Sequence, residues 1–359
     1  MNALAIIMLV FACLGALDRI FGNKFGLGAE FERGFNLLGT MALSMIGMIV
    51  LSPVIADFVS PVLDFIYNTF GIDPSVVPAS LFANDMGGAP MSVAVGKNAG
   101  VALFNALVVS SMMGCTVSYN IPFSVSAVDK KNHRELFLGM LCGISTIPLG
   151  CFVGGLFCDI PVLSLLLNLL PLIIFAALIV LGLIFIPNVC VKVFSAFGYF
   201  IKALITVGLV LGMVNFISGK ELIKGLADIE GASLICMNAA VFLAGAFPFM
   251  FIVSRLISKP ISALGKKANI NSVSAFGLVS TLVSNAPTYD KMKDMDKKGI
   301  VLNSAFAVSG AFVFGGHLAF TIAFDSALVL PVIVGKLVAG ITALVLAIFI
   351  SKKITAEKP

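Results

Sequence analysis

Long apolar runs, separated by short polar segments, dominate the chain. Many of these runs contain about 20 apolar residues, the length that spans ~30 Å of hydrocarbon as an α-helix. We expect helices at residues 3–20, 36–60, 77–95, 135–158, 162–186, 194–217, 232–257, 300–323 and 327–350. The pattern predicts an all-α polytopic membrane protein with about 10–11 membrane segments, counting two less regular stretches.

Basic residues gather in a few loops, and the positive-inside rule places such loops in the cytoplasm. They are Arg19, Lys24 and Arg33; Lys130, Lys131 and Arg134; Arg255, Lys259, Lys266 and Lys267; Lys291, Lys293, Lys297 and Lys298; and Lys352 with Lys353. Loops whose charges are only acidic should face outside; these hold Asp64 and Asp73, then Asp159, then Asp325.

The two less regular segments, residues 99–127 and 270–289, carry Asn, Ser, Gly and Pro inside otherwise apolar sequence. Segment 270–289 begins after one basic loop and ends at another, which a re-entrant hairpin can do and a straight crossing cannot. Segment 99–127 has the same problem if Lys97 is cytoplasmic. Broken backbone at membrane depth is tolerated only where protein buries it or where it lines a watery cavity. Both segments, as hairpins or as crossings, therefore point to a solute path.

Similar motifs recur in the two halves of the chain. Ser-Tyr-Asn-Ile-Pro at 118–122 and Asp-Lys-Lys at 129–131 resemble Ser-Asn-Ala-Pro at 284–287 and Asp-Lys-Lys at 296–298. Two apolar runs follow in each half. Transporters are commonly built from such repeats, with broken segments in corresponding positions at the binding site.

These motifs predict an internal repeat with halves 31–186 and 194–350. The basic loops favour parallel halves, whereas two true crossings at the irregular segments would make the halves inverted. The composition agrees with a single integral membrane domain over residues 1–359. The chain is 59% hydrophobic and 11% charged, with a mean hydropathy of +1.10, whereas soluble domains carry roughly 25% charged residues.

Several functional classes lack their sequence signals. The net charge of +5 is too modest to indicate nucleic-acid binding. The seven cysteines form no CxxC pair, so neither a disulfide framework nor a zinc site is implied. Metalloprotease, hydrolase, P-loop and dinucleotide motifs are missing from the sequence. We therefore expect no enzyme, no bound metal or cofactor, and no ATP-driven pump.

The stretch from Phe82 to Pro90 contains the sharpest candidate site. It places Asn84 and Asp85 inside an apolar run, beside Gly87 and Gly88. A charge at the bilayer centre costs about 2.5–3.5 kcal/mol on insertion scales, so such a residue usually faces a cavity. An unwound segment with a carboxylate and free carbonyls suits a small cation or an ammonium group. The alternative is a polar turn that caps a helix near the interface.

Four further polar residues are candidates for solute binding. Asn120 and Asn285 each stand two residues before a proline, which leaves a carbonyl unpaired that the amide or a ligand hydroxyl can bind. Tyr119 offers a hydroxyl or a ring face to a cation. His317 sits in an apolar run, where a histidine gates, relays protons or binds a hydroxyl. The alternatives are helix breaks before loops, an interfacial tyrosine and a buried core histidine.

Several stretches of the sequence resemble the family of the ethanolamine utilization protein EutH. They are LDRIFGN at 17–23, glycines at 26 and 28, EFERGF at 30–35, MALSM at 41–45, PVIA at 53–56, ANDMGG at 83–88, IPFS at 121–124 and residues 129–135. The similarity runs through nearly the whole chain. The resemblance implies a permease that takes up ethanolamine across the bacterial cytoplasmic membrane for ethanolamine catabolism.

Ethanolamine carries one ammonium group and one hydroxyl group. Asp85 with Asn84 are candidates for the ammonium, and Asn120, Asn285 or His317 for the hydroxyl, with Tyr119 beside them. Two alternatives stay open at this stage: a channel-like facilitator, and a secondary transporter of another small amine or polar solute. The sequence argues against a membrane-embedded enzyme, because two histidines and scattered cysteines offer no catalytic cluster, and it shows no soluble signalling domain that a sensor would need.

Overall fold

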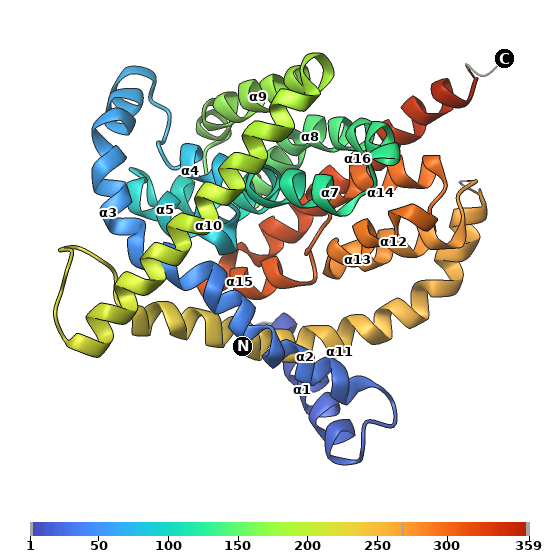
Figure 1. The fold of residues 1–359 in the computed structure, drawn as a ribbon, viewed down its shortest axis with the longest axis horizontal. Coiled ribbons are helices and arrows are strands. Elements are labelled where there is room, and N and C mark those ends of the chain that lie inside the picture. Colours follow the sequence, from blue (N-terminus) through green and yellow to red (C-terminus); the bar gives the residue numbers. More distant parts are fainter. Residues whose placement is uncertain (1–2, 268, 357–359) are drawn as a thin grey trace.

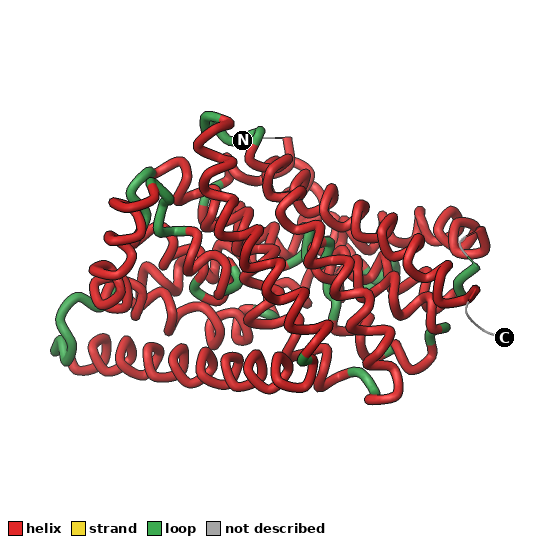
Figure 2. The backbone as a smooth tube through the Cα atoms, turned by 90° about the horizontal axis from the view of Figure 1, so that it is seen from above, coloured by secondary structure: helices red, strands yellow, loops and turns green. Residues whose placement is uncertain are grey.

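Helices joined by short loops form the part of the chain that the computed structural model describes, residues 3–267 and 269–356 (Figures 1 and 2). This part contains no strand. Seven stretches within it are long and apolar enough to cross a bilayer: Leu27–Phe70, Ala99–Ala127, Lys130–Gly155, Val162–Phe185, Pro187–Ser218, Ile229–Val253 and Ser326–Ser351. The prediction of an all-α polytopic membrane protein is confirmed, but these seven stretches of the described residues are fewer than the 10–11 membrane segments that the sequence predicts.

Helices outside the hairpins and the broken segments make up much of the described structure. They are α1 (Ala3–Ile20), α2 (Leu27–Asn36), α3 (Leu38–Phe70), α8 (His133–Gly155), α9 (Val162–Phe185), α10 (Pro187–Ser218), α11 (Ile229–Lys267) and α16 (Val329–Ala356). In Figure 1, α11 runs along one edge with α1 and α2 packed on it, and α10 crosses α3. Exposed apolar side chains on α9 and α10, such as Leu163, Phe185 and Phe216, form the kind of surface that a helix presents to lipid.

Small residues let α8 approach its two neighbours closely. Gly139 faces α14 (Lys297–Ser309), where an added Cβ would lie 2.3 Å from the carbonyl oxygen of Val301. Gly150 faces α16, where a Cβ would lie 2.5 Å from the carbonyl oxygen of Gly335. Close backbone approach at small residues is typical of helix packing in membranes. The packing of α8, α14 and α16 gives the candidate site a rigid wall.

The single helix predicted over residues 77–95 is wrong, because this segment is a short hairpin. It consists of α4 (Val76–Leu81), a 3₁₀ turn at Asn84–Met86 and α5 (Gly88–Val95). Gly87 turns the chain at φ 102°, a left-handed conformation that glycine adopts without steric cost. Asp73 closes the open end, since its Oδ2 accepts hydrogen bonds from the backbone N–H groups of Lys97 (3.0 Å) and Asn98 (2.8 Å).

A second hairpin has the chain reversal that we expect for residues 270–289. It contains α12 (Ser272–Val283) and α13 (Ala286–Asp290). Its two ends are tied together, because the backbone N–H of Asn271 donates to Asp296 Oδ1 at 2.8 Å. With 12 residues, α12 is too short to cross a bilayer alone. The tip between α12 and α13 holds Asn285.

Residues 99–127 form one continuous helix and not a hairpin. It joins α6 (Ala99–Phe104), π-helical stretches at Asn105–Gly114 and Thr116–Asn120, and α7 (Ile121–Ala127). Lys97, which would require a hairpin if it were cytoplasmic, pairs with Asp64 at 2.7 Å, on the side of the acidic loops. The hydroxyls inside the helix do not break it, because they donate to carbonyls one turn earlier; Ser118 Oγ bonds to Gly114 O at 2.7 Å.

The single helix predicted over residues 300–323 is also wrong. Helix α14 ends at Ser309, and α15 (Gly316–Phe324) begins after a loop. Phe312 has φ 61°, and the N–H groups of Phe312 and Phe314 donate to Thr281 O (3.1 Å) and Leu282 O (2.9 Å) near the end of α12. These bonds to the second hairpin replace helical bonds that the break removes. His317 therefore lies in the first turn of a new helix and not in the middle of a span.

Candidate functional site

The two helix breaks meet at Asp85. Its carboxylate lies beside the first residue of α15, since a Cβ added to Gly316 would lie 3.9 Å from Asp85 Oδ2. The N-terminus of a helix carries a partial positive charge that stabilises a carboxylate. The Asp85 side chain is 29% exposed, whereas the side chain of His317 next to it is 3% exposed. Asp85 is therefore the more accessible of these two side chains.

A chain of polar groups leads from Asp85 into the protein. His317 Nε2 lies 3.9 Å from Asp85 Oδ1, and His317 Nδ1 lies 3.2 Å from Lys336 Nζ. Lys336 Nζ in turn donates a hydrogen bond to Ser111 O at 2.7 Å, in the π-helical stretch. An ammonium at Lys336 donates to Nδ1, which places the imidazole proton on Nε2, facing Asp85.

Lys336 is a buried cation beside the candidate site that the sequence analysis missed. The signal was present, because an ionisable residue inside an apolar run such as 327–350 is a functional candidate by itself. Its side chain is among the largest fully buried ones in the described residues, at 1% exposure. Its partners are a carbonyl and an imidazole from two other helices, and only the folded structure shows that they lie beside it.

Asn84 is buried at 0% exposure, and neither its Nδ2 nor its Oδ1 has a hydrogen-bond partner within the described structure. A buried polar group left unpaired costs about 1–3 kcal/mol, so native proteins rarely keep one without a reason. The orphaned amide adjoins Asp85 in the same turn. The amide thus has an unused donor and an unused acceptor in the turn that holds Asp85.

Asn120 and Asn285 bind each other. Asn285 Nδ2 donates to Asn120 Oδ1, and Asn120 Nδ2 lies 3.3 Å from Ala307 O and 3.4 Å from Val308 O near the end of α14. The pair thus connects the π-helical stretch, the second hairpin and α14. Both asparagines are fully buried. These contacts place them in the framework of the site.

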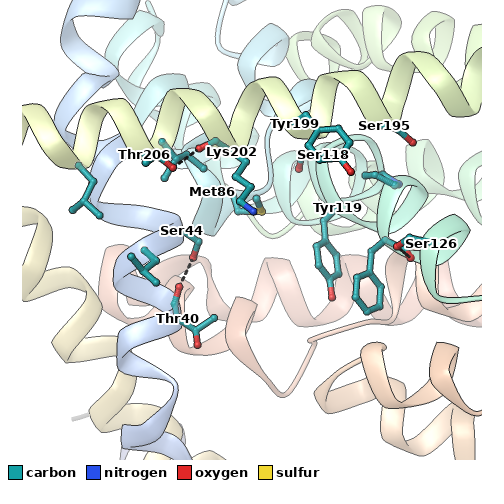
Figure 3. Close-up of a pocket in the computed structure, with 16 residues that line it drawn as sticks. Thr40, Ser44, Met86, Ser118, Tyr119, Ser126, Ser195, Tyr199, Lys202 and Thr206 are labelled. Atoms are coloured by element: carbon teal, nitrogen blue, oxygen red, sulfur yellow. Dashed lines mark hydrogen bonds between the residues drawn. The ribbon is translucent and has the colours of Figure 1, made fainter.

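Tyr119 lines a cavity of about 570 Å³ between α3, α10 and α7. Hydroxyl groups are frequent on its wall, and Figure 3 shows those of Thr40, Ser44, Ser118, Ser126, Ser195, Tyr199 and Thr206. Met86, the neighbour of Asp85, lies on the same wall. The cavity therefore reaches the turn that holds the carboxylate.

Aromatic rings connect the cavity with the buried polar groups. The ring centroid of Phe312 lies 5.9 Å from that of Tyr119 and 4.9 Å from that of His317. Tyr119 also stacks on Phe123 at 5.1 Å. Phe312 is thus a shared neighbour of the cavity wall and of the histidine.

The structure divides the six candidate residues of the sequence analysis among three places. Asn84, Asp85 and His317 meet at the helix breaks, Asn120 and Asn285 form the framework pair, and Tyr119 lies on the cavity wall. Across residues 3–267 and 269–356, no cluster of three or more His, Cys, Asp or Glu side chains is placed to hold a metal ion.

Comparison with known proteins gives a consistent result. The family profile described as "Ethanolamine utilisation protein, EutH" matches residues 1–350. A protein of Listeria monocytogenes serotype 1/2a (strain 10403S), named "Probable ethanolamine permease EutH", is 41% identical over 347 residues, which cover 97% of this chain and 93% of that protein. The protein of the same name from Escherichia coli (strain K12) is 37% identical over 385 aligned positions, covering 97% and 94%.

A further relative carries no functional name. "Uncharacterized protein YxeR" of Bacillus subtilis (strain 168) is 34% identical over 357 residues, which cover 99% of this chain and 96% of that protein. No solved structure matches the chain.

Proposed function

The chain belongs to the EutH family of ethanolamine utilisation proteins, and from this premise we propose that it is a permease that imports ethanolamine. It is a multi-pass protein of the bacterial cytoplasmic membrane. The relatives are named permeases, and we assign the chain no enzymatic activity. The imported amine would supply ethanolamine catabolism.

One observation carries the assignment of the binding site. Asp85 is a part-exposed carboxylate at the junction of two broken helices, next to an unpaired buried amide and a cavity. Ethanolamine is a primary amine and is protonated near neutral pH, as lysine is with a pKa of ~10.4. In the proposed complex, Asp85 binds the ammonium and the amide of Asn84 binds the hydroxyl. Transporters bind solutes at such breaks, where backbone and side-chain dipoles are free.

His317 and Tyr119 complete the proposed site, whereas Asn120 and Asn285 position it. His317 Nε2 lies 3.9 Å from the carboxylate that would receive the ammonium. Tyr119 and the cavity hydroxyls would offer polar contacts to a small molecule on its way to the site. The Asn120–Asn285 contact holds the second hairpin against the π-helical stretch, so its loss would displace Phe312 and His317 together.

Uptake of labelled ethanolamine by the purified protein in liposomes tests this proposal. Asp85→Asn keeps the shape of the side chain and removes its charge, so we expect uptake to fall to the level of empty liposomes. Asp57→Asn, at an exposed carboxylate of α3, is the matched control and should transport normally. Normal uptake by Asp85→Asn with intact membrane insertion would remove Asp85 from the site.

Counterflow separates the carrier from the channel-like alternative. Liposomes preloaded with unlabelled ethanolamine should accumulate the labelled compound transiently, because a carrier exchanges one bound molecule for another. A flux that rises linearly with concentration and shows no exchange would assign a channel.

A further inference from the structure

Lys336 is buried without an anion in contact. It lies inside the span Ser326–Ser351, and its Nζ has two polar contacts, Ser111 O at 2.7 Å and His317 Nδ1 at 3.2 Å. Within the described part of the chain, no carboxylate oxygen lies within 4.0 Å of it. A cation buried in this way is costly unless an opposite charge lies nearby. The proposed ethanolamine site, as described above, does not use this residue.

Asp85 is the carboxylate that can compensate the charge of Lys336, and the imidazole of His317 lies between the two. The other titratable groups that face the lysine are Cys115 beside the π-helical stretches and Cys151 on α8, together with His317 on α15. The two charged residues of α14, Lys297 and Lys298, stand at the opposite end of that helix from its break, on its first turn. The 3.9 Å between His317 Nε2 and Asp85 Oδ1 is longer than a hydrogen bond, so the histidine does not occupy the carboxylate.

A substrate ammonium at Asp85 changes this balance. The carboxylate would then face two positive charges, one on the substrate and one on Lys336. In a medium of low dielectric constant, one carboxylate cannot compensate both. Removal of a proton from Lys336 restores a neutral site, because the bound substrate cation then pairs with Asp85 alone.

The hydrogen bond between Lys336 and His317 can form whether the lysine is protonated or neutral. With a charged lysine, Nζ–H donates to Nδ1 of the neutral imidazole. After the lysine gives one proton to Nδ1, Nε2 releases its own proton to water near Asp85. The imidazole stays neutral with its tautomer reversed, and Nδ1–H then donates to the lone pair of the neutral amine. One N–H bond of Lys336 breaks, and one proton reaches the solvent.

We propose that Lys336 is a proton-exchanging cation coupled to the substrate site, so that binding of the ethanolamine cation at Asp85 releases one proton from Lys336 through His317. This inference rests on the proposed function. A cycle in which Lys336 regains its proton on the other side carries one organic cation inward for one proton outward. Such a cycle moves no net charge.

Isothermal titration calorimetry of the purified protein in detergent tests this inference. Ethanolamine is titrated at pH 7 in two buffers with different ionisation enthalpies, such as phosphate and Tris. If about one proton is released per ethanolamine bound, the binding enthalpies in the two buffers should differ by the difference between the ionisation enthalpies of those buffers. Lys336→Met, which replaces the cation by an apolar chain of similar length, should bind with no release. Lys192→Gln, at an exposed lysine of α10, should release the proton as the original protein does.

The experiment distinguishes a failure of the role of Lys336 from a failure of the proposed function. Equal enthalpies in both buffers for the original protein, or an unchanged release in Lys336→Met, would overturn the role of Lys336. No binding by the original protein would overturn the proposed function and this inference with it. If Lys336→Met does not fold, the exchange can be tested by measuring the electrical current across liposomes that contain the original protein. Ethanolamine uptake without a sustained inward current supports the exchange, and uptake with a current of one charge per molecule contradicts it.

Discussion

At the scale of single residues, two buried asparagines with the same exposure have different surroundings. Asn120 is held by Asn285 and by two carbonyl oxygens of α14, whereas Asn84 has no protein partner within the described residues. A hydrogen-bonded amide contributes to folding, and an orphaned one opposes it. The difference predicts opposite effects of the same substitution.

Asn84→Ala should weaken ethanolamine binding by about 5–30-fold, because one or two hydrogen bonds of ~1 kcal/mol each are lost. The thermal stability of the substrate-free protein should be unchanged or higher. Binding titrations and melting curves in detergent measure the two quantities. Unchanged affinity together with a lower melting temperature would show that the amide serves folding.

Asn120→Ala should behave in the reverse way. We expect a loss of about 1–3 kcal/mol of stability, because Asn285 and two carbonyls of α14 lose a buried partner. Asn285→Ala should cause a similar loss, and the double variant should lose less than the sum of the two, because the substitutions remove one shared contact. Additive losses would contradict the framework role of the pair.

At the scale of elements, glycine positions decide which helices pack closely. Gly139→Ala should lower the melting temperature by several degrees, because the added Cβ meets the backbone of α14 at 2.3 Å. Gly39→Ala on α3 is the matched control, since no atom lies within 4 Å of its Cβ position and alanine favours a helix by about 1 kcal/mol. Equal melting temperatures for the two variants would show that α8 and α14 separate easily.

The sequence predicts most of the helices, because apolar runs of membrane-spanning length are strong local signals. It also predicts the second hairpin, since charges at both of its ends restrict the path of the chain. The break at Asn84–Met86 has a local signal in Gly87 and Gly88, whereas the break before Gly316 depends on contacts distant in the sequence. Phe312 and Phe314 leave the helical pattern because carbonyls of α12, about 30 residues earlier along the chain, accept their hydrogen bonds. Asp85, His317 and Lys336 are likewise brought together by tertiary contacts, so their spacing along the sequence does not predict that they lie close together.

At the scale of the whole molecule, the two hairpins open toward loops of opposite charge. The first is closed by Asp73 beside the Lys97–Asp64 pair, and the second by Asp296 within the basic segment 291–298. Each precedes a helix capped by a side chain, α6 by Asn98 and α14 by Asp296. These positions favour inverted halves. The repeat boundaries at 31–186 and 194–350 stay a prediction.

Cysteine labelling tests this orientation. Lys97→Cys should react with a membrane-impermeant maleimide in intact cells, because it lies on the side of the acidic loops. Lys131→Cys should react only in inverted membrane vesicles, since its loop is basic. The protein without an added cysteine gives the background, to which the exposed Cys13 contributes. Labelling of both variants from the same side would contradict opposite openings.

The central claim is that a solute binds where the two broken helices meet, at Asp85 and Asn84. A cryo-electron-microscopy map of the protein with saturating ethanolamine tests it most directly. We predict density for a small ligand within hydrogen-bond distance of Asp85 and of the Asn84 amide, and no such density in a map without ethanolamine. Ligand density confined to another place, such as the pocket beside Glu30 and Arg33, would contradict the account.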